Sequence, residues 1–317
     1  MSTVTTATLS EAVRNSFNFS VDKFPLSGPD RMATPHYGLF RSDTQECVGR
    51  PCAKGYVPHT TDDVCAIAEA VETVFGDCES RVETHFSNAH YVQICPTHKY
   101  RRDVFNRHHG TDGGDHFIAN RGSESTPDSI WPRIVIRAGY DATSFRCSIG
   151  LYRDLCRNMT MLQTLSETET RIRHDSNLRG KMDSLIEQLQ GLHAGWDSVH
   201  DLALQMDRRE IIVADFLHQL YGSPDETTSQ RAQTYHRNRT DAILNRLVRE
   251  YSATGRDLAQ VEAGRATGWM LFNAVQGFAQ HTQRRSSDNL MARVFAADRD
   301  RYVRQAATLA TSFDLAS

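Results

Sequence analysis

The chain has 317 residues and a formal net charge of −3 at pH 7. This length is enough to bury a sizeable core in one large domain or two smaller ones. Because the net charge is small, the chain as a whole does not attract nucleic acid, and binding to nucleic acid would need a local basic patch. The seven cysteines are scattered and form no Cys-x-x-Cys pair, which predicts reduced cytoplasmic thiols. No apolar run approaches the roughly 18 residues of a membrane span, and we expect no secretory signal.

The N-terminal region predicts an arm followed by a helix. Residues 1–35 are rich in Ser, Thr and Pro, so we expect an irregular arm with a short helix over residues 10–17. Thr60 and Asp63 are typical of a helix start, and Gly76 is typical of a helix end.

The next elements predict a small antiparallel sheet. Residues 81–86 and 90–95 favour a β-hairpin, whereas the polar, glycine-containing residues 97–128 favour a loop with a short strand at 116–120. Residues 130–136 form an apolar run, and residues 145–151 alternate with period two. These two segments predict a pair of strands.

The C-terminal half predicts helices. Leu151, Leu155 and Met159 recur at helical spacing, so we expect the second strand to pass into a helix, and Ser166 with Glu169 predicts a further helix start. Further apolar stripes mark helices near residues 182–192, 199–206, 213–220, 243–251, 269–278 and 290–306. We therefore predict an α+β fold, with a small antiparallel sheet and a flanking helix in the N-terminal half and a mostly helical C-terminal half. The predicted parts are residues 1–35 (arm), 36–160 (α+β domain) and 161–317 (helical region).

Four short segments carry a resemblance to a known family. They are residues 39–44 (LFRSDT), 139–144 (GYDATS), 150–159 (GLYRDLCRNM) and 267–275 (TGWMLFNAV). Together they resemble the phage/plasmid-like family catalogued as domain of unknown function 932, over roughly residues 36–310. The resemblance implies a fold and a mobile-element context, but no mechanism. The signature residues, which we interpret as structural, are Arg41, Asp43, Tyr140, Asp141, Cys156, Asn158, Trp269 and Asn273.

The candidate binding residues are basic and aromatic. Cations that neutralise phosphates, interleaved with rings that stack on bases, are typical of a groove for single-stranded nucleic acid. One cluster, within residues 99–107, lies at the start of the polar loop. A row of arginines, Arg133 and Arg137, follows the strand predicted from residue 130 and extends to Arg153. The alternatives are a solvated loop and an ordinary half-exposed strand. The candidates are Lys99, Tyr100, Arg101, Arg102, Arg107, Arg133, Arg137 and Arg153.

Two other kinds of site have weaker support. His108, Asp112 and His116 have the chemistry of metal ligands, but their spacing matches no metal motif, so we predict a loop and no metal. Cys156 with His174 or His281 would form a nucleophile and base, although a lone cysteine is more often a small buried residue. The sequence contains no Gly-x-Gly-x-x-Gly, Walker A or Gly-x-Ser-x-Gly motif, and we predict no cofactor.

The sequence thus predicts a non-enzymatic, phage- or plasmid-encoded protein of the bacterial cytoplasm. Its predicted partner is single-stranded nucleic acid, above all single-stranded DNA, bound or annealed in replication or recombination. Cooperative binding along a strand would favour a homo-oligomer. Two alternatives stay open: an interaction protein, such as an inhibitor of a host defence system, that uses the helical half to contact a host or phage protein, and an enzyme built on Cys156.

Overall fold

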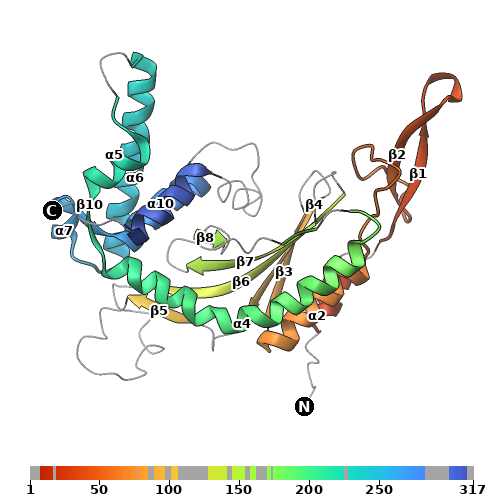
Figure 1. The fold of residues 1–317 in the computed structure, drawn as a ribbon, viewed down its shortest axis with the longest axis horizontal. Coiled ribbons are helices and arrows are strands. Elements are labelled where there is room, and N and C mark those ends of the chain that lie inside the picture. The colour runs from red at the N-terminus through yellow and green to blue at the C-terminus, as the bar shows by residue number, and fades with distance from the viewer. Residues whose placement is uncertain are drawn as a thin grey trace. The chain divides into compact units, whose positions relative to one another are not determined.

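The computed structural model of the chain has a mixed α+β architecture, with antiparallel strands in the N-terminal half and a mostly helical C-terminal half (Figure 1). This confirms the predicted fold class. The residues that the structure describes are 8–16, 19–76, 78–84, 89–96, 101–105, 128–140, 145–153, 158–161, 170–172, 174–224, 228–282 and 300–312.

The chain forms two compact units, each assembled from three separate segments. The first unit comprises residues 1–100, 132–150 and 168–196, and the second comprises residues 101–131, 151–167 and 197–317. Both units receive residues from strand β6 (Asp128–Gly139), strand β7 (Phe145–Arg153) and helix α4 (Leu178–Arg208).

The first unit begins with a helix and a β-hairpin. Helix α1 (Leu9–Ser16) confirms the short helix predicted over residues 10–17. Residues 21–35, which we expected to be irregular, instead form strand β1 (Val21–Ser27), a 3-10 turn η1 (Pro29–Arg31) and the start of strand β2 (Ala33–Arg41). The two strands pair antiparallel, with a bulge after Pro25. Most of their side chains are partly or fully exposed, so the apolar alternation that normally marks a hairpin in a sequence is missing.

Helix α2 (Thr61–Phe75) lies where the sequence predicted it. The Thr60 side chain accepts from the Asp63 backbone N–H, and the Asp63 carboxylate accepts from the Thr60 backbone N–H, which is a complete capping box. At the other end, Gly76 has a φ of 74°, which glycine adopts at little cost. The helix buries an apolar face in the first unit: Val64, Cys65, Ile67, Ala68, Val71 and Phe75.

The central sheet has strand order β3-β4-β6-β7-β8. Strands β3 (Cys78–Thr84) and β4 (Ala89–Pro96) form the predicted antiparallel hairpin, and β4 pairs antiparallel with β6 (Asp128–Gly139). Strand β7 (Phe145–Arg153) is the neighbour of β6 and confirms the predicted strand pair.

Two predictions around the sheet are wrong. The predicted handover to a helix after Leu151 does not occur, because β7 continues to Arg153 and residues Asn158–Met161 form strand β8. Part of the predicted loop over residues 97–128 is strand β5 (Arg102–Phe105), which pairs with the start of β6. Strand β9 (Thr170–Ile172) pairs with β7. The strand predicted at 116–120 and the helix start predicted at Ser166 and Glu169 lie outside the described residues.

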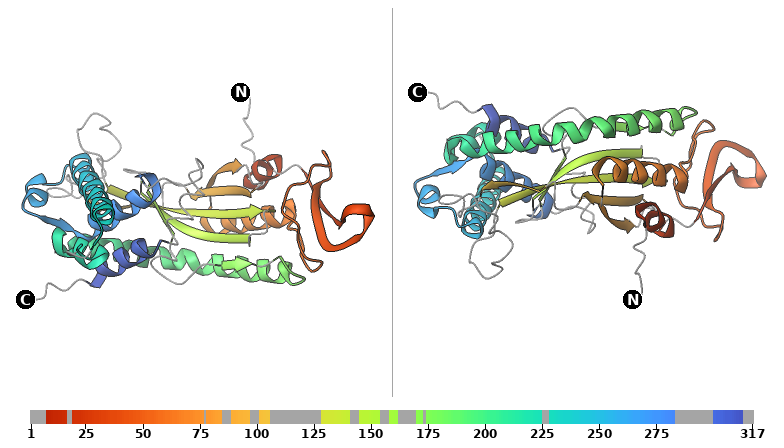
Figure 2. Two further views of the ribbon diagram at one scale, coloured as in Figure 1. Left: turned by 90° about the horizontal axis from the view of Figure 1, so that it is seen from above. Right: turned by 90° about the horizontal axis from the view of Figure 1, so that it is seen from below.

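The remaining elements follow in chain order and build the helical half. They are α4 (Leu178–Arg208), β10 (Glu210–Ile212), α5 (Val213–Tyr221), α6 (Gln230–Thr254), α7 (Leu258–Glu262), β11 (Arg265–Thr267), α8 (Gly268–Gly277), the π-helical turn η5 (Phe278–Thr282) and α10 (Arg301–Ser312). Helix α4 is continuous where the sequence predicted separate helices (Figure 2, green).

Helix α8 is the centre of the second unit. All ten of its residues are buried, and both α6 and α10 pack against it. A Cβ added at Gly268 would lie 2.7 Å from the carbonyl oxygen of Ala310 and 3.0 Å from that of Met206. Glycine therefore permits the close approach of the neighbouring backbones at the start of α8.

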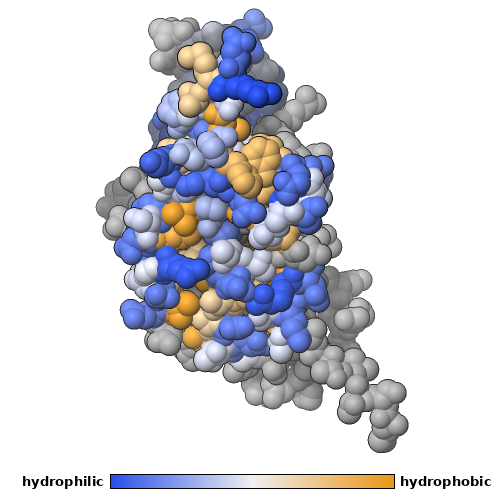
Figure 3. Space-filling model, turned by 90° about the vertical axis from the view of Figure 1, so that its right-hand side faces the viewer, coloured by the Kyte–Doolittle hydropathy of each residue, from blue (hydrophilic) through white to orange (hydrophobic). Residues whose placement is uncertain are grey.

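No helix in the described ranges is long and apolar enough to cross a membrane. On the face drawn in Figure 3, the apolar side chains form separate spots between hydrophilic ones. Scattered apolar residues of this kind are ordinary on a protein surface and mark no docking site.

Candidate nucleic-acid interface

The first predicted basic cluster is only partly described. Lys99, Tyr100 and Arg107 lie outside the described residues. Arg101 donates to the hydroxyl of Ser129 at 2.8 Å, and its Nε lies 3.7 Å from a carboxylate oxygen of Asp103. Arg102 donates to the carboxylate of Asp197 at 3.1 Å. Because neighbouring carboxylates already compensate both cations, their attraction for a phosphate is reduced.

The arginine row of the sheet is present but short. Arg133 and Arg137 lie four residues apart on β6 and therefore on one face of the strand, as predicted. Both side chains are partly exposed, while Val135 between them is fully buried. Their contact with nucleic acid stays a prediction.

Arg153 does not extend this row, because it is fully buried in the second unit. Its Nε and Nη2 donate to the two carboxylate oxygens of Asp128 at the start of β6, the second at 2.7 Å. Its Nη1 donates to Glu250 of α6 at 2.6 Å. The prediction that Arg153 binds nucleic acid is therefore wrong, since a guanidinium enclosed by two carboxylates has no surface to offer a phosphate.

Further charged groups complete this buried cluster. The indole N–H of Trp269 donates to Asp128 at 2.9 Å, and Arg256 lies 2.8 Å from Asp207 and 3.8 Å from Asp128. Burial raises the pKa of Asp207, whereas the neighbouring Arg256 lowers it. The guanidinium of Arg256 also lies 3.8 Å from the ring centroid of Phe105. Buried charges are tolerated when they are paired, so the cluster joins β6, β7, α4, α6 and α8 as a structural junction.

The N-terminal signature residues contact their own unit. Arg41 and Asp43 form a two-bond ion pair of 2.9 and 2.7 Å, and the Arg41 guanidinium covers the ring of Phe19. Tyr140 stacks on His59, with ring centroids 4.4 Å apart, and its hydroxyl donates to the His59 carbonyl at 3.2 Å. Burial raises the pKa of Tyr140.

Two further signature residues, Trp269 and Asn273, lie in the core of the second unit. Asn273 donates to the carbonyl oxygen of Trp269 at 2.9 Å, and both are buried in α8. Asn158 begins strand β8, so the expectation that it caps a helix is wrong. Asp141 and Cys156 lie outside the described residues. The interpretation of the signature as structural fits these contacts and stays a prediction.

A basic stripe that we did not single out in the sequence lies on the first half of α6. Arg231, Tyr235 and Arg239 recur every four residues and share one face of the helix. A shallow depression beside them is also lined by polar side chains, those of Gln230, Thr234 and Asn238. Tyr235 is 55% exposed, and the Arg239 guanidinium lies 5.4 Å from the centroid of its ring.

These arginines differ from those of β5 in their pairing. Arg231 and Arg237 are exposed, and no ion pair joins Arg231, Arg237 or Arg239 to a carboxylate within the described ranges. The sequence has no acidic residue from 228 to 240, and Asp241 is the first that follows. The first half of α6, residues 230–240, therefore presents uncompensated positive charge beside an exposed aromatic ring. We call it the basic stripe of α6.

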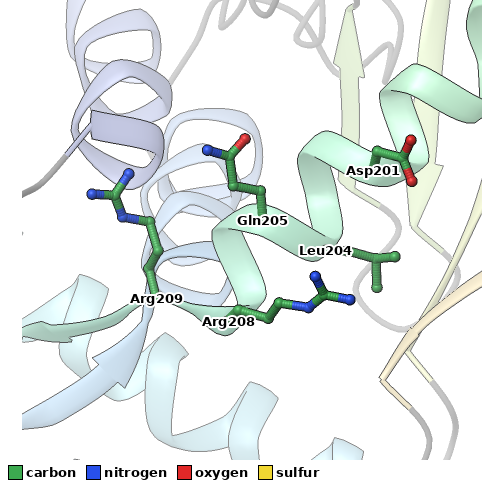
Figure 4. A pocket seen from close by; sticks show the side chains of 5 residues that line it. All are labelled: Asp201, Leu204, Gln205, Arg208 and Arg209. Carbon is green, nitrogen blue, oxygen red and sulfur yellow. The ribbon is translucent and has the colours of Figure 1, made fainter.

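A second arginine-containing pocket is less suited to an anion. It has a volume of about 390 Å³ and lies at the end of α4. Figure 4 shows that the guanidinium groups of Arg208 and Arg209 point in different directions, and Asp201 and Leu204 also line the pocket. Two diverging cations do not form a clamp for one phosphate.

A family model described as "Domain of unknown function (DUF932)" matches residues 99–309, which is more than half of the chain. The chain belongs to the DUF932 family. This confirms the resemblance found in the sequence. The part of this DUF932 chain that matches contains the Arg153 cluster and all of α6, while the β1–β2 hairpin and α2 precede it. Neither a curated protein nor a solved structure matches the chain.

The signal for the basic stripe was present in the DUF932 sequence. Arginine, tyrosine and arginine at intervals of four, within an acid-free run, predict one charged and aromatic helix face. It was overlooked because the apolar positions that mark a packed helix begin only at Ile243. Among the residues that the structure describes, no group of three or more His, Cys, Asp or Glu side chains is arranged to hold a metal ion.

Proposed function

We propose that this DUF932 protein binds single-stranded nucleic acid, above all single-stranded DNA, through the basic stripe of α6. The observation that carries the proposal is the combination of Arg231, Tyr235 and Arg239 on one helix face, where Arg231 and Tyr235 are exposed, Arg239 is half-buried and neither arginine has a described carboxylate partner. Binding to a nucleic acid releases counterions from its backbone in proportion to the phosphates that such cations neutralise.

The exposed ring favours a single strand over a duplex. Unpaired bases stack on aromatic side chains, whereas the bases of a duplex are already stacked on each other and open only their edges to a protein. Tyr235 lies between two arginines along the stripe, so one strand can place a base on the ring and its flanking phosphates on the guanidinium groups. Gln230, Thr234 and Asn238 add neutral hydrogen-bonding groups that favour no particular sequence.

The test is a fluorescence-anisotropy titration of a short labelled single strand at low salt. The double variant Arg231→Ala/Arg239→Ala should bind about ten-fold or more weakly, since hydrogen bonds to charged groups contribute roughly 1.5–3 kcal/mol each. The same sequence as a duplex should bind less tightly than the single strand. No binding of the wild-type protein at low micromolar concentration would overturn the proposal.

Arg249→Ala is the matched control. Arg249 is an exposed arginine of the same helix and has no ion pair within the described ranges, but it lies beyond the basic stripe. We expect this variant to bind like the wild type. Equal weakening by Arg249→Ala would show that binding does not depend on the first half of α6.

A further inference from the structure

Beside the basic stripe, the second unit contains a pocket walled by tyrosine and arginine side chains. Its volume is about 250 Å³, and it lies between the end of α5, the first half of α6 and the start of α10. Tyr221, Tyr235 and Tyr302 come from these three helices, and Arg239 and Arg301 supply the cations. The pocket is smaller than the roughly 300–1,000 Å³ of most small-molecule sites, so it suits one planar base with a phosphate at its mouth rather than a whole cofactor.

Arg239 is the centre of this arrangement. Its guanidinium lies 3.7 Å from the ring centroid of Tyr221 and 5.1 Å from that of Tyr302, while Tyr221 and Tyr302 are 4.8 Å apart. Stacking on rings fixes the plane of the guanidinium. Hydrogen bonds from Arg301 and Arg239 lower the pKa of Tyr302, so part of the N–H edge of Arg239 faces that hydroxyl and its remaining N–H groups can meet a further acceptor. Its buried Nε finds no hydrogen-bond acceptor, and no carboxylate pairs with Arg239, in the parts of the chain that the structure describes.

The start of α10 adds a second cation. Arg301 donates to the hydroxyl of Tyr302 at 2.7 Å, and its guanidinium lies 4.6 Å from the ring centroid of Tyr302. Among the described residues that line the pocket, one is acidic: Asp300, whose carboxylate accepts from the backbone N–H of Tyr302 at 2.9 Å. Two guanidinium groups therefore face one carboxylate, and the balance of charge favours an anion.

The geometry points to a site for one unpaired nucleotide, with its base against Tyr235 and its phosphate between Arg239 and Arg301. This inference rests on the proposed function and adds to it a specific base-binding position. An acidic peptide would satisfy the cations but would leave the exposed face of Tyr235 without a planar partner. A quaternary ammonium ligand, which also binds in tyrosine cages, would be repelled by the two arginines.

The experiment compares a short single strand with an abasic strand that has the same number of phosphates. The wild type should bind the strand with bases about five-fold or more tightly, because stacking of one base on an aromatic ring contributes about 1–3 kcal/mol. Tyr235→Ala should remove that advantage and leave binding of the abasic strand unchanged. Tyr235→Phe should retain it, and Arg239→Ala should weaken binding of both strands.

The outcomes separate the site from the proposed function. If the wild type binds both strands equally, or if Tyr235→Ala weakens both equally, the nucleotide site is refuted while nucleic-acid binding stands. If the wild type binds neither strand, both proposals fall. Val248→Ala removes another exposed apolar side chain of α6, outside the pocket, and should change neither affinity.

Discussion

Replacing Arg153 by methionine removes a buried cation while keeping a long, unbranched side chain. Arg153 and Asp128 are fully buried and Glu250 is nearly so, and both carboxylates would lose their closest cation. Breaking one side of a buried ion pair costs about 3–5 kcal/mol, because the remaining charge stays buried with less compensation. Asp128 would keep Arg256 at 3.8 Å and Glu250 would keep Arg246 at 3.2 Å, so the loss should lie toward the lower end of this range. Proteins have a net stability of about 5–15 kcal/mol, so this single change would remove a large share of it.

Urea unfolding followed by tryptophan fluorescence measures this loss. With a slope near 3 kcal/mol per molar urea, a loss of 3–5 kcal/mol lowers the unfolding midpoint by about 1–1.7 M. Trp269 reports on the site directly, since its indole donates to Asp128.

Arg265→Met is the matched control for this prediction. Arg265 pairs with Glu210 at 2.8 Å, but the two side chains are 59% and 49% exposed, so the expected loss is below about 1 kcal/mol. The reasoning would be refuted if Arg153→Met lowered the midpoint no more than Arg265→Met does. A loss of affinity for nucleic acid without a loss of stability would instead place Arg153 at the surface, as the sequence alone predicted.

Three further predictions concern stability. Gly268→Ala should destabilise the protein by about 1–3 kcal/mol, because the added methyl group meets the Ala310 backbone, and the thermal midpoint should fall accordingly. Thr60→Ala removes the N-cap of α2 and should cost about 1 kcal/mol in urea unfolding, with no change expected for Thr60→Ser. Burial raises the pKa of the Cys147 thiol from 9.0 to about 12, so between these two pH values the thiol is ionised only in the unfolded protein. The stability that this thiol contributes is present below pH 9.0 and is lost as the pH rises toward 12, and Cys147→Ala should weaken the alkaline loss measured by urea midpoints.

The parts of the fold that local chemistry determines were predictable from the sequence. The capping box at Thr60 and the glycine at Gly76 place helix α2 because each satisfies backbone groups within a few residues. The hairpin of β3 and β4 and the pair of β6 and β7 follow from alternating and apolar runs. The β1–β2 hairpin was missed because most of its side chains are partly or fully exposed, and burial in β1 does not follow hydrophobicity: Lys23 is half-buried whereas Phe24 is exposed.

The burial of Arg153 could not be predicted locally. Its partners, Asp128 and Glu250, are 25 and 97 residues away, and only the assembled second unit brings them together. The helical spacing of Leu151 and Met159 is a coincidence, because Leu151 lies in strand β7 and Met159 lies in strand β8. By contrast, the spacing of Arg231, Tyr235 and Arg239 was sufficient to predict that they share one helix face, because residues four apart lie on the same side of a helix.

The salt dependence of binding tests the central claim most directly. For single strands, the logarithm of the binding constant falls with the logarithm of salt concentration with a slope of about −0.7 per neutralised phosphate. If Arg231 and Arg239 each neutralise one phosphate, replacing both by alanine should make the slope shallower by about 1.4, while Arg249→Ala leaves it unchanged. A wild-type slope that the double replacement does not alter would contradict the assignment of nucleic-acid binding to the basic stripe of α6.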